Sequence, residues 1–398
     1  MPSTLPVGLR WPESNRIPAL DSGKRTFHAY VHVPFCVARC GYCDFNTYTS
    51  DELNGDLRSG FDQYLIKEIE TSEVVLRDSG YSQRELSTVF FGGGTPSLFT
   101  AGQFGRVLAA LQERFGIAAD AEVTTEANPE STSVQWLSDL RGQGVNRLSM
   151  GVQSFDDGVL SVLERGHSKD HVGPLVKAAR DLGYEVSIDL IYGAPGESLE
   201  SWKSTLSSAL ELGTDHISAY SLIVEPGTKL ERKIRKGEVP ATDEDLNAAK
   251  YELTTEMMSS AGLSWYEVSN WGKPSLHNSA YWASQDWWGY GPGAHSHLAG
   301  NRFWNQKHPA SYQSALSKGL AVAGREELTA TQRLEEELML CLRTMSGVPK
   351  TLLRELNVEP SLVAKAIGQG FLEPVGDRLV VSVKGRLVVD RLVLDFLS

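Results

Sequence analysis

Short apolar runs and longer amphipathic segments alternate through roughly the first two-thirds of the chain. The short runs have the length and composition of β-strands, whereas the longer ones repeat their apolar positions at helical spacing. The expected strands span residues 27–33, 87–91, 121–126, 146–151, 185–191 and 216–221. The expected helices span residues 62–78, 103–114, 134–141, 171–182 and 199–212. This alternation predicts an α/β fold of repeated βα units around a parallel sheet.

Six consecutive units predict an incomplete (βα)6 parallel barrel and not a closed eight-stranded one. In such folds the functional residues lie on loops at the carboxyl ends of the strands. The five loops after the first five strands carry the unusual residues of this chain, which are a cysteine-rich loop, then GGGTP at 92–96, EANP at 126–129, GVQS at 151–154 and a loop beginning near DLIYG at 189–193. We therefore expect a functional site on one rim of the barrel.

The remaining sequence suggests three further parts. Residues 1–26 are rich in Pro and Ser and are expected to form a flexible lead-in before the barrel of residues 27–225. Residues 226–325 are dense in Trp, Tyr, Gly and His and are expected to cap the open barrel. Residues 326–398 read as three helices (331–343, 350–356 and 361–370), a strand pair (371–375 and 378–383) and a last helix after Lys384. That order predicts a small C-terminal winged-helix-like domain.

Composition and charge narrow the classes of protein that fit. The chain has 398 residues, 41% hydrophobic and 22% charged, which is ordinary for a globular protein. A mean hydropathy of -0.24 predicts no membrane-spanning helix. The formal charge of -12 argues against sequence-independent binding to nucleic acid or to an anionic membrane surface. With no apolar run of signal-peptide length near the start and cysteines too close together for a disulfide framework, we expect a cytoplasmic protein.

Three of the four cysteines, Cys36, Cys40 and Cys43, form a CxxxCxxC run directly after the first expected strand. Three thiolates so placed can hold three irons of a [4Fe-4S] cluster and leave the fourth iron open to chelate a substrate. A Cys₃His zinc site that uses His32 or His28, or a set of free thiols, remains an alternative. The fourth cysteine, Cys341, lies in an apolar run and is expected in the core.

The GGGTP turn offers exposed backbone groups to a ligand. Gly93 and Gly94 leave N–H and C=O groups uncovered, so that a ligand with amino and carboxylate groups could approach closely, and Thr95 adds a hydroxyl. A tight turn before Pro96 would explain the same residues without a ligand. The position on the same rim as the cysteines favours a binding role.

Four polar residues at or just past strand ends complete the rim: Glu126, Gln153, Arg165 and Asp189. Each could be a helix cap or part of a surface ion pair. Together they resemble a pocket for a zwitterion that bears a ribose, because arginine binds carboxylates and acids bind hydroxyl or ammonium groups. We expect Arg165 to lie within a helical stretch at residues 160–167.

Histidines gather in the aromatic-rich segment. His277, His295 and His297 could each offer an imidazole to a haem iron, and the glycine-rich loop 289–296 leads into the last two. Each could equally be an ordinary hydrogen-bonded residue of the capping segment.

The order of CxxxCxxC, GGGTP, EANP, GVQSF and IDLIYG resembles that of radical S-adenosylmethionine (SAM) proteins, and specifically of the coproporphyrinogen dehydrogenase-like group. The resemblance runs from about Tyr30 to the end of the chain. It implies that the open iron chelates the methionine amino and carboxylate groups of SAM. It also implies that an electron entering the sulfonium releases a 5′-deoxyadenosyl radical.

The same resemblance implies a role for each rim residue. Cys36, Cys40 and Cys43 would hold the cluster, whereas Tyr30 would lie near SAM and Tyr42 beside its adenine. The residues that would contact the methionine portion or complete the pocket are Gly93, Gly94, Thr95, Glu126, Gln153, Arg165 and Asp189.

Two motifs point to one branch of this group. The porphyrin-forming dehydrogenases have a further cysteine two residues after the third, where this chain has Phe45 in the sequence CDFN. That ending and the HNxxYW element at 277–282 are similar to the haem chaperone branch, which implies a protein that binds haem and passes it to respiratory proteins. The haem ligand candidate is His277, and a homodimer and transient contact with membrane proteins are further expectations.

Other readings of the same cofactor site remain open. The main alternative is an oxygen-independent coproporphyrinogen III dehydrogenase, which decarboxylates propionates by a radical route, and the residue after Asp44 counts against it. A radical enzyme acting on an unrelated substrate is a third reading, because the cofactor site is shared across chemistries. Some relatives have a cysteine where this chain has Pro292, so no thiolate role is expected for that loop.

Overall fold

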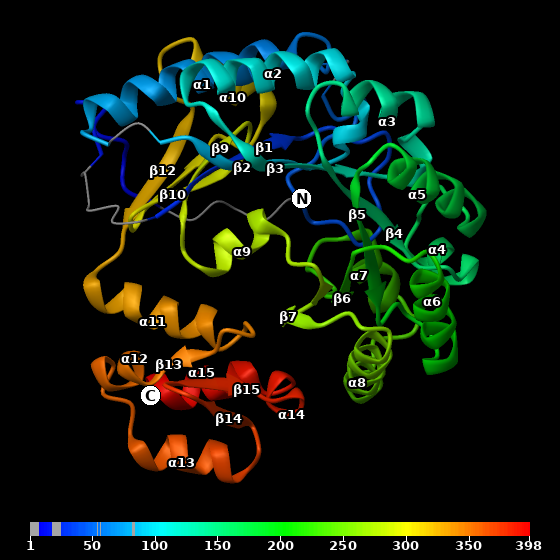
Figure 1. The fold of residues 1–398 in the computed structure, drawn as a ribbon. Helices are drawn as coiled ribbons and strands as arrows, with labels where there is room; N and C mark the ends of the chain where they lie inside the picture. The colour runs from blue at the N-terminus through cyan, green and yellow to red at the C-terminus, as the bar shows by residue number, and fades with distance from the viewer. Residues whose placement is uncertain (1–7, 18–24, 54, 56, 82–83) are drawn as a thin grey trace.

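The computed structural model describes residues 8–17, 25–53, 55, 57–81 and 84–398. Its centre is a curved sheet of six parallel strands with helices on the outer face, as Figure 1 shows. The strands are β1 (Phe27–Val33), β2 (Leu86–Gly93), β3 (Ile117–Ala127), β4 (Arg147–Gln153), β5 (Glu185–Tyr192) and β6 (His216–Ser221). The predicted incomplete (βα)6 barrel is confirmed, and each of its six strands was expected within a few residues of its observed position.

Helices cover the outer face of these strands. They are α1 (Phe61–Asp78), α2 (Ala101–Arg114), α3 (Val134–Arg141), α4 (Asp157–Val162), α5 (Val172–Asp181) and α6 (Leu199–Glu211), with short 3₁₀ turns at Pro96–Leu98, Pro129–Ser131 and Lys169–His171. Capping residues fix where several of them begin: Thr100 and Gln103 form a capping box at α2, and Ser198 accepts a hydrogen bond from the Ser201 amide at α6. Helix α4 lies earlier than the helical stretch expected at residues 160–167 and overlaps it only at residues 160–162.

Because side chains alternate along each strand, apolar residues of the sheet face the surrounding helices and polar residues face the interior of the barrel. In β1 the residues Ala29, Val31 and Val33 are fully buried under the helices, whereas His28 and Tyr30 point the other way. The same period of two directs polar residues of the other strands inward, among them Thr88, Glu126, Ser149, Asp189 and Ser218. A barrel interior with this many polar groups is built to hold a ligand and not only to pack.

The segment predicted to cap the barrel extends the sheet instead. It contains α7 (Lys229–Arg235), α8 (Glu244–Ser260), β7 (Trp265–Glu267), β8 (Asn270–Gly272), α9 (Leu276–Trp282), β9 (Asp286–Tyr290), β10 (His295–Leu298), β11 (Asn301–Asn305), α10 (Pro309–Leu316) and β12 (Val322–Glu327). The strand order is β12-β11-β10-β9-β1-β2-β3-β4-β5-β6-β8-β7, so new strands lie on both edges. Aromatic side chains such as Trp271, Trp288 and Tyr290 become fully buried in this way.

The C-terminal part forms a separate small body at the bottom of Figure 1. It consists of α11 (Ala330–Cys341), β13 (Val348–Pro349), α12 (Lys350–Glu355), α13 (Pro360–Gly368), β14 (Leu372–Val375), β15 (Arg378–Val381), α14 (Val383–Arg386) and α15 (Val389–Leu397). The expected three helices and hairpin are present. The short strand β13 joins them to complete a three-stranded sheet in the order β13-β15-β14.

Part of the expected flexible lead-in is attached to the barrel. Leu9 exchanges two backbone hydrogen bonds with Arg325, at 2.8 and 3.0 Å, and the Trp11 ring packs edge-on against Phe303 at 5.2 Å. Ile17 is buried. The expectation of a free segment is therefore wrong for residues 8–17, because their apolar side chains find partners on the late strands. The rest of the lead-in up to residue 24 lies outside the described residues.

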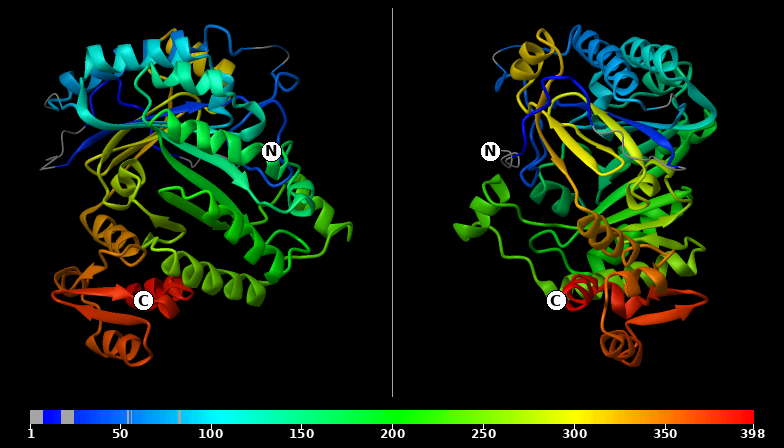
Figure 2. Two further views of the ribbon diagram at one scale, coloured as in Figure 1. Left: turned by 45° about the vertical axis from the view of Figure 1, so that its right-hand side comes forward. Right: turned by 90° about the vertical axis from the view of Figure 1, so that its left-hand side faces the viewer.

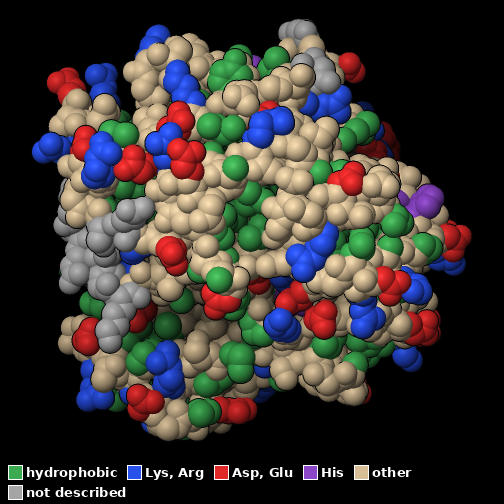
Figure 3. All heavy atoms as spheres, turned by 45° about the horizontal axis from the view of Figure 1, so that its top comes forward, with side chains coloured by type: hydrophobic (Ala, Val, Ile, Leu, Met, Phe, Trp, Pro, Cys, Tyr) green, Lys and Arg blue, Asp and Glu red, His purple; other side chains and the backbone are tan. Residues whose placement is uncertain are grey.

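The face shown in Figure 3 has no large patch of like charge, because acidic and basic side chains are interspersed on it. None of the described helices has the length and apolar character needed to cross a bilayer. The two further views of Figure 2 show the C-terminal body below the barrel from both sides.

Candidate cluster and cofactor site

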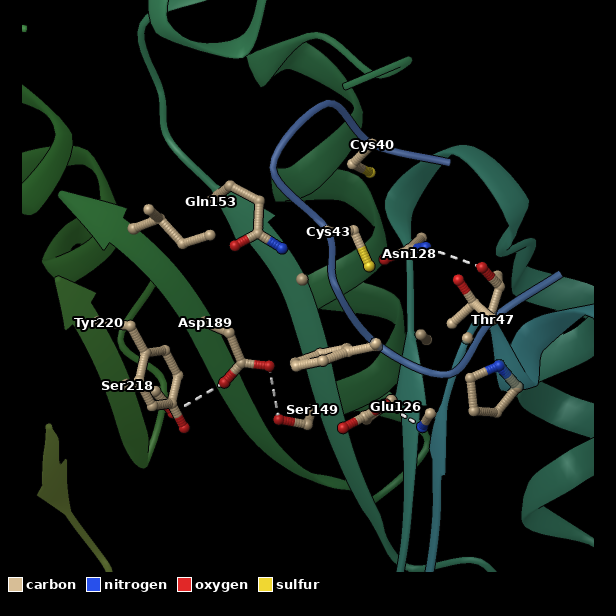
Figure 4. Close-up of a pocket in the computed structure, with 18 of the residues that line it drawn as sticks. Cys40, Cys43, Thr47, Glu126, Asn128, Ser149, Gln153, Asp189, Ser218 and Tyr220 are labelled. Atoms are coloured by element: carbon tan, nitrogen blue, oxygen red, sulfur yellow. Dashed lines mark hydrogen bonds between the residues drawn. The ribbon is translucent and has the colours of Figure 1, made fainter. Parts of the chain in front are cut away.

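The three cluster cysteines, the nine residues expected around SAM and the haem-ligand candidate His277 all line one cavity of about 1100 Å³ inside the barrel. The cavity opens at the carboxyl ends of the parallel strands, beneath the cysteine loop, and continues down between the strands. Figure 4 shows side chains from four successive strands, β3 to β6, pointing into it together with Cys40 and Cys43 from the loop above. The rim expected from the sequence is thus a single continuous site.

The cysteine loop is fixed at several points of its backbone. The Cys36 amide donates to the Tyr48 carbonyl at 3.0 Å, and the Thr95 amide donates to the Phe35 carbonyl at 2.7 Å. The Leu230 amide of α7 donates to the Gly41 carbonyl at 2.8 Å from the other side. The loop is therefore held in place by the glycine turn and by α7, although it carries almost no regular secondary structure.

The three thiols are free and face hydrogen-bond donors. The Thr95 hydroxyl lies 3.5 Å from Cys36 Sγ, and Arg165 Nη1 lies 3.6 Å from Cys40 Sγ. Burial raises the pKa of the Cys36 thiol and raises that of Cys43 to about 11. Thiols with raised pKa values keep their protons near neutral pH, and coordination of iron would displace those protons. Sulfurs with donors nearby fit thiolate ligands of a metal cluster.

The zinc alternative does not fit this geometry. Both ring nitrogens of His32 are engaged, with the Tyr30 hydroxyl at 2.9 Å and the Asn46 carbonyl at 2.9 Å. His28 lies near the opposite end of β1, between Thr26 and Thr88. Burial lowers the pKa of each ring to about 4. Among the described residues no three His, Cys, Asp or Glu side chains converge on a single ion.

The glycine turn packs directly under the cysteine loop. Gly93 has φ 114°, and a Cβ there would lie 2.5 Å from the His32 ring; a Cβ on Gly94 would lie 2.6 Å from the Phe35 carbonyl oxygen. Neither position tolerates a side chain. The Gly93 amide donates to Glu126 Oε2 at 3.0 Å. The glycines are therefore required for close packing of the turn, as the alternative without a ligand predicts. The turn also keeps backbone groups at the cavity wall.

Two carboxylates face the cavity, Glu126 from β3 and Asp189 from β5, with β4 between their strands. Burial, together with the nearby Asp189 charge, raises the pKa of Glu126 to about 7. Burial also raises the pKa of Asp189, although the Ser149 and Ser218 hydroxyls both donate to it at 2.8 Å, as Figure 4 shows. Two acids whose charges interact in a buried cavity are stabilised by a cationic or hydroxyl-bearing ligand placed between them.

Arg165 reaches the cavity from a loop and not from the expected helix. Helix α4 ends at Val162, and Glu164 adopts a left-handed conformation at φ 58° before Arg165 leaves the helical path. The guanidinium donates to Asn128 Oδ1 at 2.9 Å and to the Gly151 carbonyl at 3.0 Å. Its buried Nε has no hydrogen-bond partner among the described residues. Gln153 also has positive φ, at 66°, where a bulge ends β4.

Several cavity residues were not singled out from the sequence. They are Asn128, Arg147, Ser149, Ser187, His216, Ser218 and Tyr220. Most lie two residues from a predicted site residue, or on the same inward face of a neighbouring strand. Because polar residues at every second position of a buried parallel strand are uncommon, that alternation was the available signal.

His277 lies at the floor of this cavity and is fully engaged. Its Nδ1 lies 2.6 Å from the Thr88 hydroxyl and its Nε2 lies 2.8 Å from the Tyr281 hydroxyl. The ring stacks on Phe90 with centroids 5.1 Å apart, and burial lowers its pKa well below the ordinary value. An iron at Nε2 would have to replace the Tyr281 bond. His295 lies on β10 outside this cavity, and His297 borders a second one.

Cys341 is half-buried against the core, close to the expectation, and it also borders the second cavity.

Comparison with known proteins agrees with this geometry. Residues 30–209 match the model of the radical SAM superfamily. The chain is 42% identical over 377 residues to "Heme chaperone HemW" of Mycobacterium tuberculosis, covering 94% of this chain and 95% of the relative. It is 32% identical to the protein of the same name from Bacillus subtilis, covering 90% of this chain and 96% of the relative.

A solved structure shares nearly the whole fold. Coproporphyrinogen III oxidase (HemN) from Escherichia coli, a radical SAM enzyme, aligns with a TM-score of 0.80 at 25% sequence identity, covering 94% of this chain and 90% of that one. The sequence matches separate the chain from that enzyme and place it with the chaperones. The chain therefore belongs to the radical SAM superfamily and, within it, to the HemW family.

Proposed function

We propose that this protein is a haem chaperone that carries a [4Fe-4S] cluster and SAM in its barrel, binds haem and transfers it to acceptor proteins. The family membership supports the general role. The observation that carries the proposal is the cysteine loop, which joins three free thiols at the barrel mouth with Phe45 at the place of a fourth cysteine.

The residues present fit the cluster and SAM. Cys36, Cys40 and Cys43 would hold three irons, and the buried Arg165 Nε and Thr47 hydroxyl, which lack partners among the described residues, leave donors for added groups. When bound, the cluster would supply an electron and an open iron for SAM. Gly93 and Gly94 present backbone to the methionine portion, and Tyr42 lies beside Cys43 for the adenine.

The polar residues of the cavity would orient SAM. Glu126 and Asp189 offer carboxylates to hydroxyl or ammonium groups, and Arg165 offers a cation to a carboxylate. Gln153, turned inward by its positive φ, adds an amide, and Tyr30 closes the same wall. These roles follow the sequence resemblance, and the cavity supports them by bringing all of the side chains together.

Haem loading tests the function directly. Reconstituted protein under anaerobic conditions should bind haem saturably, as followed by its Soret absorption, and should pass it to an apo acceptor protein. Absence of saturable binding would contradict the chaperone proposal. The same preparation given coproporphyrinogen III, SAM and a reductant should form no protoporphyrinogen IX beyond a single turnover.

The dehydrogenase remains the second candidate because the barrel of the porphyrin-forming enzyme superimposes on this chain over most of its length. Multiple turnovers in the coproporphyrinogen assay would establish it and overturn the carrier role. Phe45 argues for the carrier, because a cysteine follows at that place in the porphyrin-forming group.

A further inference from the structure

A second cavity, of about 580 Å³, lies on the other side of α9 from the first. His277, Asn278 and Tyr281 of α9 face the barrel cavity, whereas Ser279 and Trp282 face the second one. Its opposite wall is α11, the first helix of the C-terminal body, which Figure 1 shows below α9. A volume of roughly 300–1,000 Å³ is typical of sites for small molecules and cofactors.

One face of α11 is turned to this cavity. Five of its residues, spaced three and four apart, line the cavity: Arg333, Glu336, Glu337, Leu340 and Cys341. Thr344 and Met345 border the cavity from the segment after the helix, and Met345 is 55% exposed. Trp282 and Leu328 supply apolar surface from the body of the protein. The cavity therefore combines an aromatic wall, soft sulfur atoms and guanidinium groups.

Among the described arginines around this cavity, the Arg333 guanidinium has no ion-pair partner. Arg378 donates to the carbonyls of Ser346 and Gly347, at 2.6 and 2.7 Å. Glu336 is paired with Arg302. The Arg333 guanidinium makes no ion pair and no hydrogen bond with any described residue, although Glu336 and Glu337 share its helix face. An unpaired, half-buried guanidinium beside an apolar wall favours a ligand carboxylate.

The Cys341 thiol is also without a hydrogen bond among the described residues. It is the last residue of α11 and is half-buried. Burial raises its pKa, and the neighbouring Glu337 adds to that effect. A protonated thiol of this kind is a poor nucleophile, yet a metal can displace its proton.

We propose that this second cavity is the haem seat, with Cys341 Sγ as an axial iron ligand, Arg333 paired with a propionate and Trp282 against the macrocycle. The inference rests on the proposed haem-binding function and deepens it. On binding of ferric haem the Cys341 S–H bond breaks, an Fe–S bond forms and the proton passes to solvent, so no electron is exchanged.

This seat separates haem from the cluster chemistry. The barrel cavity stays available for SAM, and α9, which carries the HNxxYW element, forms the partition between the two sites. The haem would lie at the junction of the barrel and the C-terminal body, where a relative motion of the two could open a path to an acceptor.

Haem titration of the full-length protein and of Cys341→Ser tests the ligand. After ferric haem is bound, the sample is reduced with dithionite and exposed to carbon monoxide, and the wild type should then give the red-shifted Soret band of a thiolate-ligated ferrous carbonyl complex. The variant should lose that band and bind haem more than about tenfold more weakly. Serine is nearly isosteric, so circular dichroism should show an unchanged fold.

Arginine variants test the propionate contact. Arg333→Gln should weaken haem binding by about tenfold, whereas Arg354→Gln, an exposed arginine on α12 of the same small body, should leave it unchanged. Arg333→Lys should recover part of the loss, because the charge returns without the fork geometry.

Each outcome has a distinct meaning. Wild-type protein that fails to bind haem saturably overturns the proposed function together with this inference. Saturable binding that Cys341→Ser and Arg333→Gln leave unchanged overturns the inference alone, and it places haem elsewhere on the chain.

Discussion

The mouth and the floor of the barrel cavity are built on opposite principles. At the mouth, the Arg165 Nε and the Thr47 hydroxyl are buried without partners, and three thiols lie free. At the floor, a chain of hydrogen bonds of 2.6 to 2.8 Å joins Thr88, His277 and Tyr281, and Phe90 stacks on the imidazole. The polar groups at the mouth need a ligand to provide hydrogen-bond partners, whereas the polar groups at the floor already have partners within the protein.

That difference separates binding residues from supporting ones. A buried polar group without a partner costs about 1–3 kcal/mol, which a bound ligand can return. A histidine whose two ring nitrogens are both engaged has nothing left to offer a metal. We therefore expect substitutions at the mouth to change cofactor content, and substitutions at the floor to change stability.

Replacing one cluster cysteine should have the largest effect. Cys36→Ser should abolish nearly all bound iron and the broad visible absorption after anaerobic reconstitution, because two thiolates cannot hold the cluster. Iron and sulfide analysis checks this, and Cys341→Ser serves as the matched control that retains both. Full iron content in Cys36→Ser would show that another group completes the site.

A floor substitution should act on folding. His277→Ala removes two buried hydrogen bonds and a stacked ring, so the free energy of unfolding should fall by about 2–4 kcal/mol. Urea denaturation measures the change, and Tyr281→Phe, which removes only one of these bonds, should cost about 1 kcal/mol. A stable His277→Ala protein that no longer binds haem would instead make His277 the haem ligand.

The guanidinium at the mouth should act on cofactor affinity. Arg165→Leu should weaken SAM binding by about 10–100-fold, since a charge-assisted hydrogen bond is worth about 1.5–3 kcal/mol. Calorimetric titration of the reconstituted protein measures it. Arg180→Leu, which changes an exposed arginine of α5 that contacts only the Leu212 carbonyl, should bind SAM as the wild type does. Equal affinities in all three proteins would remove Arg165 from the site.

The smallest effect should be a pH dependence at Glu126. Its pKa of about 7 in the folded protein exceeds the ordinary 4.5, so the folded state holds a proton that the unfolded chain releases. Stability should therefore fall as pH rises from about 4.5 to 7. Glu126→Gln should gain about 1 kcal/mol over the wild type near pH 8 and nothing near pH 5, by thermal denaturation.

Glu68 also has a pKa raised to about 7 by burial and remains in both proteins, so only the difference between them reports on Glu126. An identical pH dependence in wild type and Glu126→Gln would show that Glu126 is ionised throughout this range.

The barrel and its mouth could be predicted from the sequence because they are encoded locally. Each strand is a short apolar run, and the cysteines, glycines and Asp189 follow their strands directly. The position of Arg165 could not be predicted, because the left-handed Glu164 that turns the chain out of the helix has no distinct sequence signal. The engagement of His277 depends on Thr88 and Tyr281 of other elements and becomes visible only in the fold.

The added strands of the late aromatic segment could not be predicted for the same reason. Its strands are three to six residues long, and their partners lie far away in sequence: β9 pairs with β1, and β8 pairs with β6. The aromatic residues that suggested a cap are the ones that fill the core around these added strands. The second cavity could not be predicted either, because its walls come from segments far apart in sequence, among them α9 and α11, which about fifty residues separate.

The pairing of β1 with β9 has a consequence for synthesis of the protein. Phe27 is aligned with Asp286, so one edge of the first strand stays uncovered until about 260 further residues have been made. An open parallel edge is prone to association with other chains, and such distant pairing slows folding. A nascent chain that stops before residue 286 would expose that edge, so we expect fragments ending near residue 225 to aggregate during translation and the complete chain to remain dispersed.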